Sequence, residues 1–599
     1  MKNFKEKADL IWRVADLLRG DYKQSDYGKV ILPMTVLRRL DCVLKTTKQK
    51  VLDYLPKVDS LKESGKDIAL NKIAGFNFHN RSQFNFDKLI ADPNNVSVNL
   101  RNYINGFSTS AREIIEYFNF DDQIDRMDDP KTDILFRVVK AFQEIDLTDM
   151  DSMEMGYTFE ELIRKFAEQS NETAGEHFTP REVIRLMVNV LFIEDKDILT
   201  QDGIVKTLYD PACGTGGMLS VGEQYVKELN PKAELKVFGQ EINPESYAIC
   251  KSDMLIKGQN PSNIKFGNTF TVDGLEEEKF DYMLSNPPFG VDWKKAEKII
   301  KTEADGKGMS GRFGAGLPRI NDGSLLFLQH MISKMKSGGT RIGIVFNGSP
   351  LFTGAAESGE SNIRKWIIEN DWLEAVIALP DQLFYNTGIS TYIWIVTNNK
   401  SVERSGKVQL INATGAKDEE LTKEAKLDFN RFWQKMDRSL GNKRKKIAEN
   451  GNSKGIGFIT QLYGNFEENE FCKILPNEFF GYWRITVEQP IKENGKVVKT
   501  KGKPKPDTTL RDYENIPFLK KDADGNLVPQ IIKAYFEEEV LPHLPEAWID
   551  HSKTKLGYEI NFTKYFYEFK PLRPLVDIKL DILALEEKIL ETEKTVLDL

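Results

Sequence analysis

The sequence predicts an α/β protein built on a doubly wound parallel sheet, with an all-helical region before the sheet and a helical tail after it. From about residue 155 to 415, short β-branched runs alternate with segments that have helical periodicity. Before residue 150, apolar residues recur at three-to-four spacing, and the last residues of the chain do the same. Strands that alternate with helices are typical of a parallel sheet covered on both faces.

The first 150 residues contain few strand signals. The segments IWRVADLLRG and YGKVILPMTVLRRLDCVL place apolar side chains on one face of a helix. We therefore expect an all-helical N-terminal domain over residues 1–150.

The central region, residues 151–415, contains the strands of the predicted sheet. Seven apolar runs are expected to be strands: Ile204–Asp210, Leu235–Glu241, Phe280–Asn286, Arg341–Asn347, Leu373–Leu379, Thr391–Thr397 and Val408–Asn412. Helix-like segments separate most of them, so the sheet should be seven-stranded and doubly wound. The last two runs lie close together in the chain, which predicts an antiparallel hairpin at one edge.

Residues 416–570 are mixed and charged, and residues 571–599 have the pattern of a heptad helix. Its seam consists of Leu575, Ile578, Ile582, Leu585, Ile589, Thr592, Val596 and Leu599. A single helix has no means of burying such a seam against itself. Packing on the body of the chain and pairing with a partner helix are both compatible with this pattern.

Composition excludes several classes of protein. The 599 residues carry a net charge of −8, whereas a protein that grips DNA alone over a long footprint is usually basic. The four cysteines lack the spacing of a zinc site and fit a reducing cytoplasm, so no metal is expected. The chain contains no apolar run long enough to span a membrane, and its first residues lack a signal-peptide core.

A glycine-rich turn follows the first predicted strand, with the sequence Asp210-Pro211-Ala212-Cys213-Gly214-Thr215-Gly216-Gly217. Glycines let the backbone approach a ligand closely, and ligands of open α/β sheets bind at the carboxyl ends of strands. Glu241 ends the next predicted strand and can accept hydrogen bonds from both hydroxyls of a ribose. The lysine of a phosphate-binding loop is missing, and Asp210 suits a cationic ligand, so the pattern favours S-adenosylmethionine.

The third predicted strand is followed by Asn286-Pro287-Pro288-Phe289. The Asn286 side-chain oxygen and the Pro287 carbonyl offer two acceptors for the hydrogens of one exocyclic amino group. Phe289 offers a flat face on which a flipped-out base can stack. Hydrogen bonds that hold both hydrogens out of the ring plane would free the nitrogen lone pair for attack on a sulfonium methyl. An isolated motif of this kind is also compatible with a stiff turn.

The order of these motifs resembles the amino-methylating DNA methyltransferases of the gamma arrangement, in which the cofactor motifs precede NPPF. Upstream, Glu176-His177-Phe178-Thr179-Pro180-Arg181 is similar to the segment that lies against the methionine end of the cofactor. Downstream, Gly267-Asn268-Thr269 resembles the element that contacts the cofactor adenine. The stretches LLRGDYKQSDYGKVILPMTVLRRLDCVL and LPDQLFYNTGISTYIWIV are similar to the methylase subunit of type I restriction–modification systems.

This resemblance implies a Rossmann-like, S-adenosylmethionine-dependent methyltransferase that modifies the 6-amino group of adenine in double-stranded DNA. It implies that two copies assemble with one specificity subunit, which the C-terminal helix would contact, and optionally with a restriction subunit. The alternative is an amino-methyltransferase that acts on the cytosine amino group, RNA or protein glutamine. The expected catalytic residues are Asn286, Pro287, Pro288 and Phe289. The expected cofactor-binding residues are Glu176, His177, Phe178, Thr179, Pro180, Arg181, Asp210, Gly214, Thr215, Gly216, Gly217, Glu241, Asn268 and Asn286.

Two further segments lie outside these motifs. Residues 489–509 are rich in lysine, and their composition favours a solvated loop or linker over contact with DNA phosphates. Residues 302–323 are rich in glycine, which makes them costly to order without a partner. For residues 302–323 we consider the hypothesis that they close over DNA or the flipped base, with Arg312 and Arg319 contacting phosphates.

Overall fold

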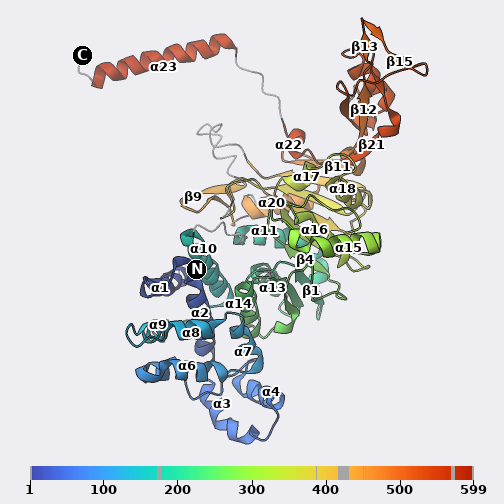
Figure 1. Cartoon of the computed structure of the whole chain (residues 1–599). Coiled ribbons are helices and arrows are strands. Elements are labelled where there is room, and N and C mark those ends of the chain that lie inside the picture. Colours follow the sequence, from blue (N-terminus) through green and yellow to red (C-terminus); the bar gives the residue numbers. More distant parts are fainter. Residues whose placement is uncertain are drawn as a thin grey trace. The chain divides into compact units, whose positions relative to one another are not determined.

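The structure is a computed structural model that describes residues 3–170, 179–385, 387–415, 431–449, 451, 454–567 and 574–596. The chain divides into two compact units, Met1–Ile560 and Asn561–Leu599 (Figure 1). No described helix is both long and apolar enough to cross a membrane.

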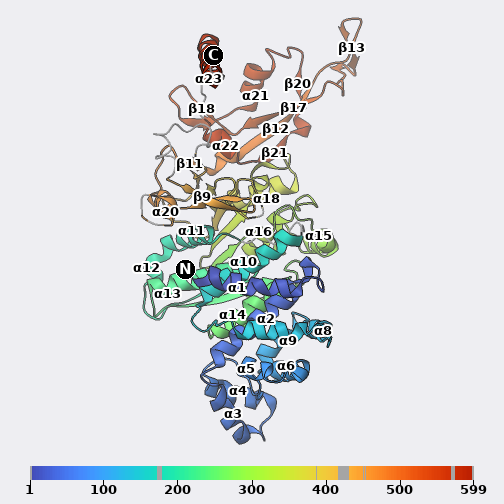
Figure 2. The same ribbon diagram turned by 90° about the vertical axis from the view of Figure 1, so that its left-hand side faces the viewer.

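The N-terminal region is all-helical, as predicted. Its helices are α1 (Asn3–Leu18), α2 (Gly28–Leu44), α3 (Lys48–Tyr54), α4 (Glu63–Ala74), α5 (Phe86–Ile90), α6 (Val96–Asn105), α7 (Thr109–Glu116), α8 (Phe120–Met127), α9 (Ile134–Gln143) and α10 (Ser152–Ser170). Their buried core extends to Ala248, Ile249 and Leu255 of a later helix, α14 (Pro244–Ile256). Figure 2 shows α14 directly beside α2, so the helical region and the sheet region share one core.

A large sheet forms the centre of the first unit, and in the described part of the chain it has nine strands. Their order is β11-β8-β6-β7-β5-β4-β1-β2-β3. The strands are β1 (Val205–Asp210), β2 (Glu234–Glu241), β3 (Ile264–Phe266), β4 (Tyr282–Ser285), β5 (Arg341–Phe346), β6 (Leu373–Ala378), β7 (Tyr392–Thr397), β8 (Lys407–Asn412) and β11 (Cys472–Pro476). Strands β4 to β7 are buried along their whole length, because helices cover both faces of the sheet.

The seven predicted strands are present, and two further strands extend the sheet. β3 has three residues and β11 ends in Pro476, so neither displays the alternation that marks a strand in sequence. The predicted hairpin between the last two strands is wrong. β7 lies between β5 and β6 and is antiparallel to both, whereas β8 pairs in parallel with the other side of β6. β7 and β8 are close in the chain, but they are not neighbours in the sheet. β7 instead lies between β5 and β6, two strands that precede it in the sequence.

Helices cover the two faces of the sheet, as a doubly wound fold requires (Figure 1). One face carries α11 (Arg181–Phe192), α13 (Gly217–Leu229) and α14, and α11 contacts α13. The other carries α16 (Ser324–Ser333) and α18 (Gly359–Glu369), with α15 (Glu297–Lys307) beside them. The short helices α12 (Lys196–Leu199) and α17 (Ser349–Phe352) lie in the connections.

The rest of the first unit is built from small β-elements. A hairpin of β9 (Trp433–Leu440) and β10 (Lys443–Ile447) precedes α20 (Gly455–Asn465). A second sheet contains β12 (Gly481–Glu488), β17 (Asp512–Pro517), β20 (Trp548–Ile549) and β21 (Lys555–Tyr558), and β18 (Leu519–Lys521), β19 (Leu527–Pro529) and α21 (Ile532–Tyr535) accompany it.

The stretch predicted as a solvated loop has a different structure. It forms two short hairpins, from β13 (Lys492–Glu493), β14 (Lys496–Val497), β15 (Lys499–Thr500) and β16 (Lys503–Pro504). Each hairpin turns at a dipeptide that ends in glycine, a signal that the high lysine content obscured.

The second unit consists of α22 (Phe562–Tyr565) and α23 (Leu575–Val596). The helix predicted from the heptad pattern is therefore present. Its seam residues Leu575, Ile578, Ile582, Leu585 and Ile589 are all exposed.

Candidate functional site

Three strand ends meet at one edge of the sheet and carry the main polar side chains of the site. β1 is parallel to both β2 and β4, so the carboxyl ends of these strands lie at the same edge. β1 ends in Asp210, β2 ends in Glu241, and Asn286 follows β4 directly. This edge is where ligands of open α/β sheets bind.

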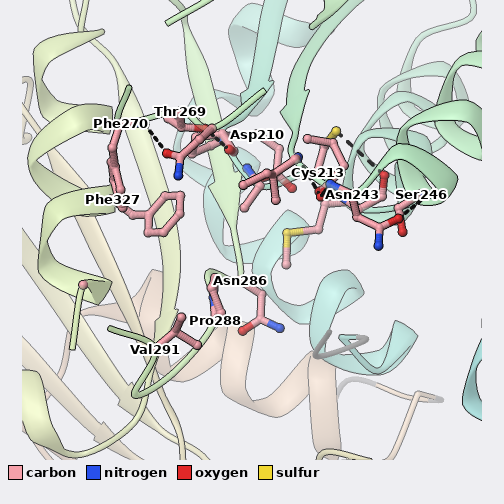
Figure 3. Close-up of a pocket in the computed structure, with 18 of the residues that line it drawn as sticks. Asp210, Cys213, Asn243, Ser246, Thr269, Phe270, Asn286, Pro288, Val291 and Phe327 are labelled. Carbon is pink, nitrogen blue, oxygen red and sulfur yellow. Dashed lines mark hydrogen bonds between the residues drawn. The ribbon is translucent and has the colours of Figure 1, made fainter. Parts of the chain in front are cut away.

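A cavity of about 470 Å³ lies at this edge (Figure 3). Nine of the predicted site residues line it: Thr179, Asp210, Gly214, Thr215, Gly217, Glu241, Asn268, Asn286 and Pro288. Five are outside the lining: Pro180, Arg181, Gly216, Pro287 and Phe289. Glu176, His177 and Phe178 lie outside the described residues. The structure thus gathers most of the predicted residues around one space, while their individual roles stay predictions.

The glycine-rich turn connects β1 to α13 at one wall of the cavity. Gly214 and Gly216 have positive φ angles of 51° and 85°. A β-carbon at Gly216 would also come within 2.8 Å of the Cys250 sulfur, so this position requires glycine for two reasons. Gly216 is the N-cap of α13, and the partly positive start of that helix therefore lies beside the cavity.

Asp210 is a buried carboxylate with two donors on one oxygen. The Ala212 backbone N–H and the Ser285 hydroxyl both donate to its Oδ1 at 2.9 Å. Burial raises the pKa of Asp210 to about 7, although these two hydrogen bonds oppose the shift. A cationic group in the cavity would favour the ionised form of this carboxyl.

Glu241 organises the backbone around it. Its carboxylate accepts hydrogen bonds from the N–H groups of Gly214 at 2.8 Å, Ile242 at 2.8 Å and Asn243 at 2.7 Å. Burial raises the pKa of Glu241, and the three N–H donors oppose that shift. Each carboxylate oxygen has more than one lone pair, so the side chain retains acceptor capacity toward a ligand that carries hydroxyls.

The segment after β3 forms another wall of the cavity, and Arg312 holds it in place. The Arg312 guanidinium donates to the carbonyls of Thr269 at 2.9 Å and Phe270 at 3.0 Å. It also pairs with Glu303 at 2.7 Å. The hypothesis that Arg312 contacts DNA phosphates is therefore wrong, because its donors are already committed inside the protein.

This wall also carries aromatic residues that no sequence pattern predicted. The ring centroids of Phe270 and Phe327 lie 4.5 Å apart. Both residues line the cavity, as does Trp293. They belong to a small apolar cluster that also contains Phe313 of the glycine-rich stretch. A flat aromatic ligand group would find apolar surface here. No local sequence signal marks these residues, which come from separate segments.

Glu160 is a second missed residue, and it comes from the helical region. It lines the cavity and pairs with the buried Arg181, whose Nη2 lies 2.5 Å from its Oε1. Arg181 also donates from Nη1 to the Gly217 carbonyl at 3.2 Å. Arg181 thus supports the glycine-rich turn from behind, and α10 contributes a side chain to the site.

The Asn286-Pro287-Pro288-Phe289 segment lies beside the cavity. In Figure 3, Asn286, Pro288 and Val291 form a group apart from Asp210 and Cys213. Pro287 is buried, and Phe289 is half-buried, with its ring centroid 6.4 Å from that of Phe384 in an edge-to-face arrangement. The burial of Pro287 and the contact of Phe289 with Phe384 therefore restrict the direction of this short segment.

Two family models match the chain. Residues 150–460 match the N-6 DNA methylase model, and residues 8–142 match the HsdM N-terminal domain. The structure is similar to that of a type I restriction-modification system methyltransferase subunit from Streptococcus thermophilus. In that comparison the TM-score is 0.58, the identity is 22%, and the match covers 80% of this chain and 97% of the other. At this identity the comparison shows the fold alone.

The chain is also similar to curated methylase subunits of type I restriction enzymes. The MjaVII type I methylase subunit of Methanocaldococcus jannaschii is 32% identical over 285 residues, which span 47% of this chain and 46% of that protein. The MjaIX methylase subunit of the same organism is 26% identical over 427 residues, 67% of this chain and 71% of that protein. The first of these matches therefore spans about half of the relative's length. Because the N-6 DNA methylase model matches more than half of the residues, the chain belongs to the N-6 DNA methylase family.

Proposed function

We propose that the chain is the methylase subunit of a type I restriction–modification system. It transfers a methyl group from S-adenosylmethionine to the 6-amino group of adenine in double-stranded DNA, at sites chosen by a separate specificity subunit. The observation that carries this proposal is the position of Asn286-Pro287-Pro288-Phe289 beside a cavity that Asp210 and Glu241 also line. Membership of the N-6 DNA methylase family supports it.

The residues of the cavity fit S-adenosylmethionine. The buried Asp210 carboxylate would face the cationic methionine end, and Glu241 would accept hydrogen bonds from the ribose hydroxyls. Phe270 and Phe327 would pack against the adenine. When bound, the cofactor supplies a methyl group on a sulfonium centre. Asn268 and the remaining predicted lining residues would enclose it and exclude water.

The Asn286 side chain and the Pro287 carbonyl would act on the target amine. Both are acceptors, so together they hold the two amino hydrogens of a flipped-out base and turn the nitrogen lone pair toward the cofactor. This geometry activates the amine by orientation, and no strong base is needed. Half-buried Phe289 would support the base that enters.

Another amino group, in cytosine, RNA or protein glutamine, is the alternative substrate. The match of residues 8–142 to the HsdM N-terminal domain favours DNA. The test is transfer of tritiated methyl groups by this chain with its cognate specificity subunit to duplex DNA, RNA or protein. We expect label in duplex DNA alone. Label confined to RNA or protein would overturn the proposal.

Cofactor affinity should depend on the ionisation of Asp210. Its pKa of about 7 lies above the usual value, so below pH 7 the folded protein holds it largely protonated and uncharged. We expect the association constant to rise by up to about tenfold per pH unit between about pH 5 and 7 and then to level off. Calorimetric titration of the wild type and Asp210→Asn at each pH measures this, and the comparison cancels titration of the ligand itself. A variant with the wild-type pH profile would contradict the assignment.

The exposed seam of α23 is the proposed contact for the specificity subunit. Five apolar seam residues are exposed on this helix, which is what an unpaired coiled-coil strand displays. We expect removal of residues 575–599 to abolish co-purification with the specificity subunit. Alanine at Asp577 and Glu587, which lie off the seam, should leave the complex intact. A truncated chain that still forms the complex would refute this contact.

Four further assignments belong to this proposal. Residues 1–150 would contact DNA or partner subunits, and residues 151–415 would form the catalytic domain. Residues 416–570 would form a mixed, charged C-terminal region before the heptad helix, from which β11 joins the large sheet. Two copies would join one specificity subunit, optionally with a restriction subunit. The cytoplasm is the expected location, which the four free, buried cysteines support.

A further inference from the structure

We propose that residues 489–507, here named the lysine arm, bind the sugar–phosphate backbone of duplex DNA next to the target site. This inference rests on the proposed function and adds a contact surface to it. The arm lies beyond both family models, which end at residues 142 and 460. Figure 1 shows its hairpins at the end of β12, away from the large sheet.

The arm is folded, although its composition resembles that of a linker. Its two hairpins turn at Asn494-Gly495, with φ angles of 50° and 76°, and at Lys501-Gly502, with φ angles of 54° and 80°. Two successive positive φ angles are typical of the type I′ turn, whose twist matches that of a tight hairpin. The lysines are therefore held on a β-ribbon.

Backbone hydrogen bonds join the two hairpins. The Val498 N–H donates to the Ile491 carbonyl at 2.9 Å, and the Lys505 N–H donates to the Val498 carbonyl at 2.8 Å. The Ile491 N–H donates in turn to the Lys505 carbonyl at 2.9 Å. The hairpins thus form one small body, and little backbone entropy remains to be given up when a ligand binds.

The base of the arm is anchored by a buried carboxylate. Glu488, the last residue of β12, is 2% exposed and accepts from Arg511 Nε at 2.9 Å and Lys553 Nζ at 3.1 Å. Farther out, Lys492 pairs with Glu546 at 2.5 Å. These contacts fix the direction in which the arm leaves the small sheet.

The small sheet is attached to the edge of the large sheet that carries Asn286. The Arg364 guanidinium of α18 is buried and donates to the carbonyls of Tyr558 in β21 at 2.6 Å and Pro350 in α17 at 3.0 Å. α17 begins shortly after the carboxyl end of β5, and β5 pairs in parallel with β4. The small sheet that carries the arm is therefore attached at the edge where, under the proposed function, the target base would enter.

The arm carries a dense positive charge that the chain does not neutralise. It contains six lysines against Glu493 and Asp507, in a protein whose net charge is −8. Among the described residues, which include the whole arm, no ion pair involves Lys496, Lys499, Lys501, Lys503 or Lys505. All five are exposed. Such a cluster fits a polyanion.

The chemistry of the arm favours DNA over an acidic segment of a partner protein. No residue from 491 to 507, all of which are described, is buried, and the arm displays no large apolar side chain. Protein interfaces depend on buried aromatic or apolar anchors and are depleted in lysine. Phosphate contacts need only positioned charges, and a two-stranded ribbon fits a DNA groove.

The test measures DNA affinity of the complex with the cognate specificity subunit as a function of salt. In the arm variant, Lys496, Lys499 and Lys503 are replaced by glutamine. The slope of log affinity against log salt should decrease by about 0.9 for each phosphate that the variant no longer neutralises, and affinity at 0.1 M salt should fall by roughly tenfold per phosphate. The Lys→Arg version of the same variant should retain the wild-type slope.

A charge-matched control replaces Lys196, Lys232 and Lys236, which are exposed near the amino ends of β1 and β2, at the opposite edge of the sheet. This variant should keep the wild-type slope. An arm variant with the wild-type slope would overturn the proposal. The proposal would also be overturned if the arm variant lost the specificity subunit but kept its DNA affinity, because the arm would then contact protein.

Methyl transfer by the wild-type complex, assayed in parallel, tests the proposed function separately, since the salt slope does not depend on catalysis.

Discussion

Replacing Asn286 with alanine is expected to reduce methyl transfer to DNA by at least about 100-fold, with only a small change in cofactor affinity. A positioned hydrogen-bonding group in an enclosed site is typically worth this much in kcat. Asn286 follows β4 and lines the cavity, where its side-chain oxygen would hold one amino hydrogen of the target base. Alanine removes this acceptor and leaves the amine planar, with its lone pair delocalised into the ring.

Single-turnover kinetics with saturating cofactor measures the effect. The matched control is Asn268→Ala, at another asparagine of the cavity that we propose lies on the cofactor side. Asn268→Ala should raise the KM for S-adenosylmethionine more than it lowers kcat. Asn286→Ala should instead lower kcat strongly and change this KM only slightly. Equal transfer by wild type and Asn286→Ala would refute the catalytic role.

Glu241→Gln is expected to weaken S-adenosylmethionine binding by about 100-fold or more. Hydrogen bonds to a charged group contribute about 1.5–3 kcal/mol each, and two ribose hydroxyls would lose such an acceptor. Glutamine also offers one oxygen to the three N–H groups of Gly214, Ile242 and Asn243 that now donate to the carboxylate. The glycine-rich turn should therefore lose part of its support, and the free energy of unfolding should fall by about 1–3 kcal/mol.

A cofactor analogue that lacks the ribose 2′-hydroxyl separates these two effects. Wild type should bind this analogue about tenfold or more weakly than S-adenosylmethionine, because it loses one charge-assisted hydrogen bond. Glu241→Gln should discriminate much less between the two ligands. Calorimetry gives both affinities. A variant that keeps the wild-type discrimination would show that Glu241 acts on the protein backbone and leaves the ribose to other residues.

Local sequence patterns predicted the part of the site that depends on strand ends. Asp210, Glu241 and Asn286 each lie at the end of an apolar run, next to a turn, so the sequence alone predicts that they share one edge of the sheet. The helical N-terminal region and the seven predicted strands are likewise encoded in short-range periodicity. Each of these features depends only on the pattern of apolar and polar residues within a short segment.

Features that depend on distant contacts could not be predicted in this way. Glu160 reaches the cavity because α10 packs behind the glycine-rich turn, and nothing in its own helix marks it. Arg312 lies in a glycine-rich stretch, and its role became clear only from its bonds to Thr269 and Phe270. The hairpins of the lysine arm had a local signal, Asn494-Gly495, but the lysine content outweighed it.

The atom of DNA that receives the methyl group shows whether this chain is an adenine amino-methyltransferase. Duplex DNA carrying the site of the cognate specificity subunit is incubated with the complex and isotopically labelled S-adenosylmethionine, then digested to nucleosides and analysed by mass spectrometry. We expect labelled N6-methyldeoxyadenosine with wild type and about 100-fold less of it with Asn286→Ala. Label found in N4-methyldeoxycytidine, or N6-methyldeoxyadenosine formed equally by both proteins, would contradict it.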